Sequence, residues 1–533
     1  MFDMTMQFPG KAKPTETKLR GGYYTPQPVA RFLAEWVSKT GSRTLEPSAG
    51  DGAILAELST RSIPTAVELL SEEAKKAQAA TGVEVHVGDF FTWFTKDRQG
   101  TFDGVAGNPP YIRFGNWDEK YRTSAFSLME TVGLQPPRRA SAWLPFVVAS
   151  VLAVRSGGRV GLVLPAEFLQ VDYAKQIRTF LIDNCSDVKI VSFSDLIFPG
   201  ILQEVVLLLA IRGEGPAQMR GIEVSDASKL ETIKLDIAAV QAPLHEDEKW
   251  TKYYLDPPQV ERLRRLRTDP RLTRVGDHAA VNVGVVTGRN SFFCMSEEQA
   301  RERGLFDHTM GLLARSASLV GTTFTEHDLQ KAETKGLNSR LLAVDQNYDA
   351  TDDRALLEYI QLGEEEEVHL GYKCSIRRPW WYVPSTQVPA GFMLRQISTL
   401  LKVASNHVGA TSTDTVHRVF TKPGVNMDKL AVASFNSVTM AFSEILGRSY
   451  GGGLLEMEPR EAVQLPIPDP EIVPDELVSE IDSLLREGRQ QEAVELMDQK
   501  VMIERAGMAE DELLDVRRAH QRLMKRRLRR GKK

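Results

Sequence analysis

Residues 43–59 read RTLEPSAGDGAILAELS, and this stretch determines the fold expected of the N-terminal half. A short apolar run ends at Glu46, a turn of small residues with two glycines follows, and a helical pattern begins at Ala53. A strand that leads into a helix through such a turn directs backbone N–H groups and the positive end of the helix dipole at a ligand. The spacing is neither GxGxxG nor GxxxxGK(S/T), so it predicts neither a dinucleotide fingerprint nor a P-loop.

The same alternation continues from about residue 20 to residue 212, as expected of strands joined by helices on both faces of a parallel sheet. Helices are predicted over 28–39, 144–154 and 174–184. We therefore expect an α/β fold, a Rossmann-like, doubly wound domain with seven strands. The predicted strands are 43–45, 65–68, 84–87, 102–106, 159–164, 188–192 and 205–211.

Later parts of the chain have different patterns. The stretch 212–216 (RGEGP) interrupts the alternation, and residues up to about 250 are polar without a clear period. A second region has Gly-rich turns, and the proline-rich LPIPDPEIVP at 465–474 precedes a strongly helix-forming end. We predict four parts: an N-terminal arm over 1–20, the α/β domain over 21–245, a mixed α+β domain over 246–466 and a helical C-terminal segment over 467–533.

Composition places the chain among ordinary folded proteins. Hydrophobic residues make up 42% of the 533 residues and charged residues 26%. The net charge is −5, but ten of the residues 517–533 are Lys or Arg and none is acidic, so the tail is strongly basic. Three cysteines without a CxxC predict neither a disulfide framework nor a cysteine zinc site, and we expect a cytoplasmic protein. Neither a membrane span nor a signal peptide is expected.

Acidic residues end the next two predicted strands. Glu68 ends the second strand, about twenty residues after the turn, where a carboxylate can accept both hydroxyls of a ribose. Asp89 ends the third strand, and Phe90 beside it can cover an adenine ring. Three consecutive strand ends are therefore expected to present acceptors to one nucleoside.

The fourth strand is followed by Asn108–Pro109–Pro110–Tyr111. The two prolines fix two φ angles and remove two N–H donors, which leaves the Asn amide oxygen and a backbone carbonyl as acceptors. Two acceptors directed at one point suit an NH₂ group, and the aromatic ring offers a stacking surface for a base. This motif predicts an enzyme that acts on an amine conjugated to a planar group.

The sequence resembles the S-adenosyl-L-methionine-dependent DNA amino-methyltransferases, and among them the gamma-class adenine-N6 enzymes of bacterial restriction-modification systems. Members of this class carry the cofactor motif, then NPPY, then a DNA target recognition domain. The phrases GVVTGRNSFF and YGGGLLEMEP also look like recognition domains of bacterial members. The resemblance identifies 21–245 as the catalytic domain and 246–466 as the target recognition domain.

The resemblance also implies residue roles. GGYYTP at 21–26 looks like the family's N-terminal motif, whose Thr contacts the methionine part of the cofactor. Phe198 matches the aromatic residue that packs on the flipped base from the side opposite Tyr111. The implied catalytic residues are Asn108, Pro109, Pro110 and Tyr111. The implied cofactor-binding residues are Tyr24, Thr25, Glu46, Ser48, Ala49, Gly50, Glu68, Asp89, Phe90 and Asn108.

By this resemblance the chain is expected to methylate the N6 amine of a flipped-out adenine in double-stranded DNA and to release S-adenosyl-L-homocysteine, without a metal. The implied partners are double-stranded DNA and a separately encoded restriction endonuclease, and a monomer fits this class. The predicted DNA contacts are Arg289, Lys373, Arg377, Arg378 and Trp380. For Lys373, Arg377, Arg378 and Trp380 the alternative is a packed strand pair with a snorkelling Arg, and for Arg289 it is a Gly-rich turn without a ligand. The basic tail 517–533 is predicted to clamp phosphates, and a solvated helix end is its alternative.

Other functions remain in competition. Cytosine-N4 methyltransferases use a similar motif, but usually with Ser in place of Asn108. Enzymes that methylate a glutamine amide in release factors also carry NPPY, but they lack the roughly three hundred residues that follow the catalytic domain here. A DNA-binding regulator with an inactive methyltransferase fold is a non-enzymatic alternative, which the intact Asn108, Tyr111, Glu68 and Asp89 disfavour.

Overall fold

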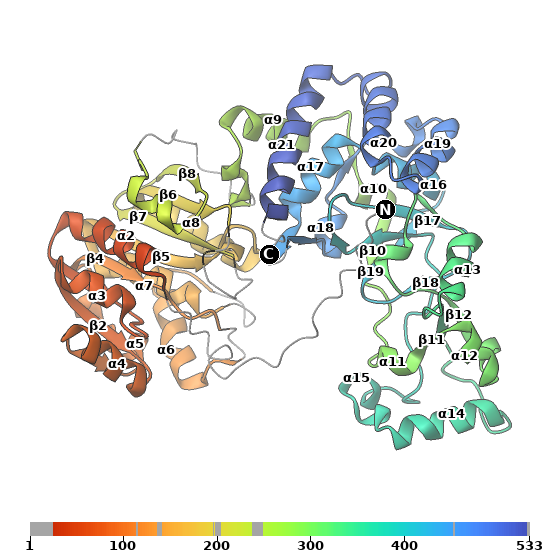
Figure 1. Ribbon diagram of the computed structural model, residues 1–533, viewed down its shortest axis with the longest axis horizontal. Helices are drawn as coiled ribbons and strands as arrows, with labels where there is room; N and C mark the ends of the chain where they lie inside the picture. The colour runs from red at the N-terminus through yellow and green to blue at the C-terminus, as the bar shows by residue number, and fades with distance from the viewer. Residues whose placement is uncertain are drawn as a thin grey trace. The chain divides into compact units, whose positions relative to one another are not determined.

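The computed structural model describes residues 25–112, 116–135, 141–195, 197, 204–236, 249–450 and 453–529. The chain divides into two compact units, Met1–Tyr254 and Leu255–Lys533 (Figure 1). The predicted N-terminal arm, Tyr24 and Phe198 lie outside the described residues. Among the helices that the structure describes, none combines the length and the apolar character that a bilayer crossing requires.

The first unit is an α/β structure built on an eight-stranded sheet of order β3-β2-β1-β4-β5-β7-β6-β8. Each of the seven predicted strands has a counterpart in it. The bounds are β1 Arg43–Glu46, β2 Ile63–Glu68, β3 Val85–Val87, β4 Phe102–Gly107, β5 Val154–Pro165, β6 Cys185–Phe193, β7 Val205–Arg212 and β8 Gln218–Val224.

Two features of this sheet differ from the prediction. An eighth strand, β8, pairs with β6 at the edge of the sheet, and its sequence QMRGIEV lacks an apolar run because most of its side chains are not fully buried. In addition, β7 is antiparallel to both of its neighbours, so the sheet is mixed rather than parallel. Periodicity reports burial and not strand direction, which is why the sequence missed this reversal.

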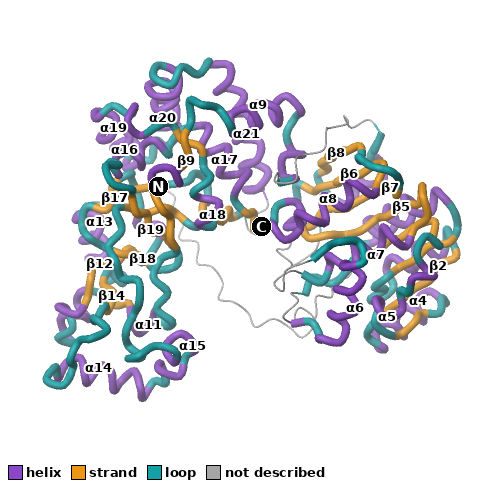
Figure 2. Tube along the Cα trace, turned by 180° about the vertical axis from the view of Figure 1, so that it is seen from behind, coloured by secondary structure: helices purple, strands orange, loops and turns teal. Residues whose placement is uncertain are grey.

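Helices cover both faces of the sheet (Figure 2). The N-terminal helix packs its buried side, which includes Leu33 and Val37, on Val163, Val191 and Leu207. On the opposite face α7 packs on β5 and α8 on β6. The helix bounds are α2 Gln27–Val37, α3 Ala53–Ser59, α4 Ser71–Thr81, α5 Phe90–Trp93, α6 Glu119–Glu130, α7 Trp143–Ala153 and α8 Lys175–Asn184.

The second unit is mixed α and β. Its larger sheets have the orders β10-β19-β15-β17-β13 and β11-β14-β12-β18, and small ones are β16-β21-β20 and β22-β9. The strand bounds are β9 Thr273–Arg274, β10 Ala279–Asn282, β11 Cys294–Met295, β12 Thr309–Leu313, β13 Thr323–Phe324, β14 Arg340–Leu342, β15 Gly391–Leu394, β16 Gln396–Ile397, β17 Val403–Asn406, β18 Thr411–Ser412, β19 Val416–Thr421, β20 Arg448–Tyr450, β21 Leu454–Glu456 and β22 Pro466–Ile467.

Helices surround these sheets, and the segment after residue 474 is helical as predicted. The helix bounds are α9 Pro257–Arg267, α10 Val275–His278, α11 Asn290–Phe293, α12 Glu297–Glu302, α13 Glu326–Thr334, α14 Arg354–Glu365, α15 Tyr372–Ser375, α16 Met427–Ala433, α17 Ser437–Leu446, α18 Pro459–Ala462, α19 Asp475–Arg486, α20 Gln490–Met497 and α21 Glu510–Arg529. The acidic run 364–367 is exposed, and its first two residues end α14.

The last helix is fixed to the unit by a buried ion pair. Arg527 on α21 and Glu444 on α17 approach to 2.6 Å, and both side chains are less than 5% exposed. Arg527 also donates to the carbonyl of Ser398 at 2.8 Å. Removing one partner of such a pair leaves an uncompensated buried charge, so this contact holds α21 against α17.

The turn after β1 depends on a close backbone approach that can be tested. Gly52 has a φ of +88°, and a Cβ there would lie 2.8 Å from the Cα of Ala77 on α4. Gly82 also has a positive φ, +71°, but a Cβ there meets nothing within 4 Å. We expect Gly82→Ala to cost roughly 1 kcal/mol from strain alone, and Gly52→Ala to cost about 1 to 3 kcal/mol more from the clash. Equal losses in urea denaturation of the two variants would contradict this.

Candidate active site

Three parallel strands end side by side at the candidate site. β1 lies between β2 and β4 and pairs with both in parallel, so the carboxyl ends of all three strands lie at the same edge. The turn that follows β1 is fixed to its neighbour because the N–H of Ala49 donates to the carbonyl of Val67 at 3.0 Å. Gly50 has a φ of +54°, and a Cβ there would meet nothing within 4 Å. The turn therefore presents its backbone to open space.

Glu68 holds this turn in place. One oxygen of its carboxylate accepts from the N–H of Gly50 at 2.8 Å and the other from the N–H of Leu70 at 2.9 Å. Each carboxylate oxygen can accept a second hydrogen bond, so the predicted role toward ribose hydroxyls is compatible with this geometry. Glu68 therefore fixes the backbone of the turn through hydrogen bonds, in addition to any contact with a ligand.

Glu46 is the most deeply buried acid of the site. Its side chain is 1% exposed, and its Oε2 has no hydrogen-bond partner among the described residues. Burial raises the pKa of Glu46 well above its usual value, and repulsion from Glu68 and Asp51 raises the pKa further. Asp51, which the sequence analysis did not select, lies in the same turn, and burial raises its pKa as well. This cluster of acids suits a positively charged ligand.

Asp89 and Phe90 follow β3. The Asp89 carboxylate accepts from the N–H and the hydroxyl of Thr92 at 2.7 and 2.8 Å, which caps α5, and burial raises its pKa. Phe90 is 3% exposed and stacks on Phe94 and Phe146, in both cases with 5.4 Å between ring centroids. Its ring is thus part of an aromatic core beneath the strand end.

The Asn-Pro-Pro-Tyr motif follows β4 and joins residues from several elements. The Asn108 Nδ2 donates at 3.2 Å to the Oγ1 of Thr25, which lies two residues before the start of α2. The Tyr111 hydroxyl lies 3.0 Å from the Asn108 Oδ1 and 3.2 Å from the carbonyl of Val163. The Ser48 hydroxyl donates to the backbone carbonyl of Asn108 at 3.4 Å. The structure therefore brings together Thr25, Ser48, Asn108 and Tyr111, which the sequence separates by up to 86 positions.

Comparison with known proteins assigns the family. Residues 55–198 match the family described as Eco57I restriction-modification methylase, and residues 247–502 match the C-terminal domain of Type II methyltransferase M.Eco57I. The chain belongs to the DNA methyltransferases of the restriction-modification type. The two matches fall in both units of this methyltransferase. The first begins inside α3, after the turn that follows β1, and includes the whole Asn-Pro-Pro-Tyr motif.

Individual relatives align over most of the methyltransferase. Type II methyltransferase M.AccI of Acinetobacter calcoaceticus is 24% identical over 468 residues, 82% of this chain and 83% of its own. M.XamI of Xanthomonas campestris pv. amaranthicola is 21% identical over 468 residues, 84% and 85% of the two chains. The solved structure of the Type IIL restriction-modification enzyme MmeI in complex with DNA has a TM-score of 0.54 at 11% identity, over 93% of this chain and 71% of that one. This likeness concerns the fold.

Several residues predicted to contact DNA are engaged inside the second unit of the methyltransferase. Arg377 donates to the carbonyls of Thr287 and Val286, each at 2.7 Å. Arg289 donates to the carbonyl of Glu366 at 2.8 Å, and Trp380 packs with its ring centroid 5.5 Å from that of Phe292. Arg378 donates to the carbonyls of Ser375 and Arg377 at 2.9 and 2.7 Å. Lys373, Arg378 and Arg289 are exposed.

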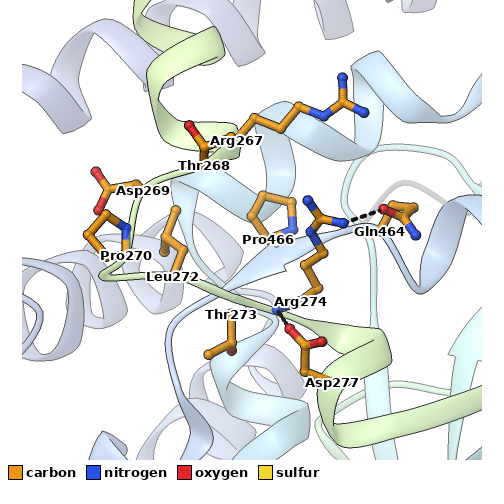
Figure 3. A pocket seen from close by; sticks show the side chains of 10 residues that line it. All are labelled: Arg267, Thr268, Asp269, Pro270, Leu272, Thr273, Arg274, Asp277, Gln464 and Pro466. Carbon is orange, nitrogen blue, oxygen red and sulfur yellow. Dashed lines mark hydrogen bonds between the residues drawn. The ribbon is translucent and has the colours of Figure 1, made fainter. Parts of the chain in front are cut away.

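A polar cavity of about 240 Å³ lies in the second unit, between the end of α9 and the β22–β9 pair (Figure 3). Arg274 crosses it and donates to the Oε1 of Gln464 at 2.9 Å, and its backbone N–H donates to Asp277 at 2.8 Å. No residue of the predicted methyl-transfer site lines this cavity. The lining residues are Arg267, Thr268, Asp269, Pro270, Leu272, Thr273, Arg274, Asp277, Gln464 and Pro466.

The burial of Glu46 predicts how stability changes with pH. Because the folded state raises its pKa, the wild-type protein loses stability as the pH rises from the ordinary value of 4.5 toward the raised one. Glutamine does not titrate, so the stability of Glu46→Gln relative to wild type should increase over that interval while its affinity for the cofactor falls. Thermal denaturation between about pH 4 and about pH 8 tests this. Glu72→Gln, at an exposed site on α4, is the control for loss of one charge, and a constant difference between Glu46→Gln and wild type would contradict the assignment.

Proposed function

We propose that this chain transfers the methyl group of S-adenosyl-L-methionine to the N6 amine of an adenine flipped out of double-stranded DNA. The target lies within a defined sequence, and the chain serves as the modification enzyme of a restriction-modification or phage-defence system. The observation that carries the proposal is the placement of Asn108, in an Asn-Pro-Pro-Tyr motif, beside the open turn after β1. The matched relatives are named Type II methyltransferases, which supports the methylation of DNA.

The residues at the strand ends fit the cofactor. Gly50 leaves room for a ligand against its backbone, and the unpartnered Oε2 of Glu46 can face a cationic group. When bound, S-adenosyl-L-methionine supplies a methyl group on a positively charged sulfur. The residues that would hold it are Tyr24, Thr25, Glu46, Ser48, Ala49, Gly50, Glu68, Asp89, Phe90 and Asn108.

Thr25 and Tyr111 orient the Asn108 amide. Thr25 accepts from the amide nitrogen, and the Tyr111 hydroxyl donates toward the amide oxygen. With both ends fixed, the side chain cannot rotate to exchange its oxygen and nitrogen. The amide oxygen has two lone pairs and can accept from Tyr111 and from a substrate amine together.

The motif then acts on the base by positioning. Asn108 Oδ1 and the Pro109 carbonyl accept the two hydrogens of N6, and neither proline offers an N–H that would compete. Both acceptors draw the nitrogen toward a tetrahedral geometry, in which its lone pair is available as a nucleophile. A flipped base is held by stacking as well as by hydrogen bonds, and Tyr111 and Phe198 are the proposed stacking residues. Correct alignment of the reacting atoms can supply most of the rate enhancement.

Modification-sensitive long-read sequencing tests this proposal. DNA is prepared from a methylation-free bacterial host that expresses either the wild-type chain or Asn108→Ala. We expect N6-methyladenine at one short motif in the wild-type sample and none with the variant. N4-methylcytosine at a motif would replace the adenine assignment by the cytosine-N4 alternative. Unmodified DNA from a folded, cofactor-binding wild-type chain would overturn DNA methylation in favour of an RNA or protein amide substrate.

The ring and the hydroxyl of Tyr111 should contribute differently. Tyr111→Phe keeps the stacking surface and loses one hydrogen bond to Asn108, so we expect kcat to fall by about tenfold or less. Tyr111→Ala loses the stacking surface, which is worth roughly 1 to 3 kcal/mol per base, so we expect a further loss of about 5-fold to 150-fold. Single-turnover methylation of a duplex measures both variants. Equal losses would assign the role to the hydroxyl instead of the ring.

A further inference from the structure

The basic tail separates into two sets of residues in the structure. Arg517 pairs with the buried Asp498 at 2.7 Å, and Arg527 pairs with Glu444 at 2.6 Å. Arg526 is 8% exposed. Arg517 and Arg527 stabilise the unit through ion pairs with buried acids and Arg526 is buried, so the charge of the tail is not uniformly exposed.

The other cations of α21 are exposed. They are Arg518, Arg522, Lys525 and Arg529, which we call the basic stripe. Their spacing is i, i+4, i+7 and i+11, which at 100° per residue places all four within about 60° of arc. The buried residues of the helix, such as Val516, Ala519 and Leu523, lie on the opposite side. The basic stripe is about 16 Å long at 1.5 Å per residue.

The acids around the basic stripe do not neutralise it. Asp515 is shared between Arg262 of α9 at 3.2 Å and Arg518 at 3.7 Å, and Asp256 lies 2.9 Å from Arg522. Within the part of the chain that the structure describes, no ion pair involves Lys525 or Arg529. Two further acids lie on elements that pack against α21, and both pair with other arginines: Glu444 on α17 with Arg527, and Glu456 on β21 with Arg395. No acid follows Asp515 on α21.

Helix stability does not explain the basic stripe. Cations favour the negative end of a helix dipole, but this effect falls off within the last turn. Arg518 and Arg522 lie two to three turns before the end of α21 at Arg529. They are exposed on a helix that packs on α9 and α17 (Figure 1). The excess of positive charge on this side of α21 is therefore not explained by the stability of the helix.

We propose that the basic stripe binds the phosphodiester backbone of double-stranded DNA. This inference rests on the proposed function and adds a contact surface to it that is separate from base recognition. The charge is complementary to the duplex, which carries one negative charge per roughly 1.7 Å of axis. A row of four cations about 16 Å long can face several phosphates at once. Such contacts position the protein and carry no sequence information.

The test is the salt dependence of DNA binding by the full chain in the presence of S-adenosyl-L-homocysteine. The variant R518Q/R522Q/K525Q/R529Q removes the basic stripe and leaves the buried pairs intact. We expect at least tenfold weaker binding at physiological salt. The slope of log K against log salt should become shallower by roughly 0.9 per lost phosphate contact. The single-turnover methylation rate at saturating DNA should stay within about twofold of the wild type, because phosphate contacts act on binding.

A matched control removes four exposed cations elsewhere. K75Q/K76Q/K331Q/K335Q produces the same change in net charge on α4, on α13 and directly after α13. Equal weakening by both variants would overturn the proposal, because the effect would then follow total charge. Unchanged duplex binding with loss of RNA binding would also overturn it. If the quadruple variant does not fold, K525Q/R529Q, whose side chains pair with no described residue, provides the same comparison with half the effect. Binding is measured without turnover, so failure of the proposed methylation and failure of the basic stripe are distinguishable.

Discussion

The candidate site depends on the contact between the Glu68 carboxylate and the backbone of the turn after β1. Glu68 ends β2, and by accepting from Gly50 it fixes that turn against the neighbouring strand. This turn also places Ser48 beside the backbone of Asn108, which follows β4. A single carboxylate thus connects three strand ends, and the cofactor site and the Asn-Pro-Pro-Tyr motif are fixed relative to each other through it.

The site combines unmet charge with a turn whose backbone requires glycine. Glu46 is buried with one unpartnered oxygen and repelled by two other acids, an arrangement that costs stability in the absence of a cation. Gly50 and Gly52 adopt backbone conformations that other residues avoid. Both features make sense if a positively charged ligand occupies the turn, since the ligand then offsets the electrostatic cost. Binding sites commonly retain such locally unfavourable groups because function requires them.

The second unit shows why charged residues in a sequence do not identify a DNA surface. Two predicted DNA contacts, Arg377 and Arg289, donate to backbone carbonyls. Arg527 of the basic tail donates to a backbone carbonyl and pairs with a buried acid. Guanidinium groups can satisfy several carbonyls at once, so a folded chain often uses them as internal supports. In α21 the arginines divide according to the side of the helix on which they lie. The spacing of the arginines in the sequence shows which of them share one side of the helix. Only the packing of the helix shows which side is buried.

The sequence by itself determined the seven apolar strands of the first unit and the motifs that follow β1, β2 and β4. Apolar runs and turn residues are local signals, and parallel strands necessarily bring their carboxyl ends to one edge. Only the tertiary structure decided the eighth strand, the reversal of β7 and the pairing of Thr25 with Asn108. These features depend on contacts between residues far apart in the chain. Local sequence patterns do not predict such contacts, because the free energy that favours one long-range contact over another is gained only when the chain packs.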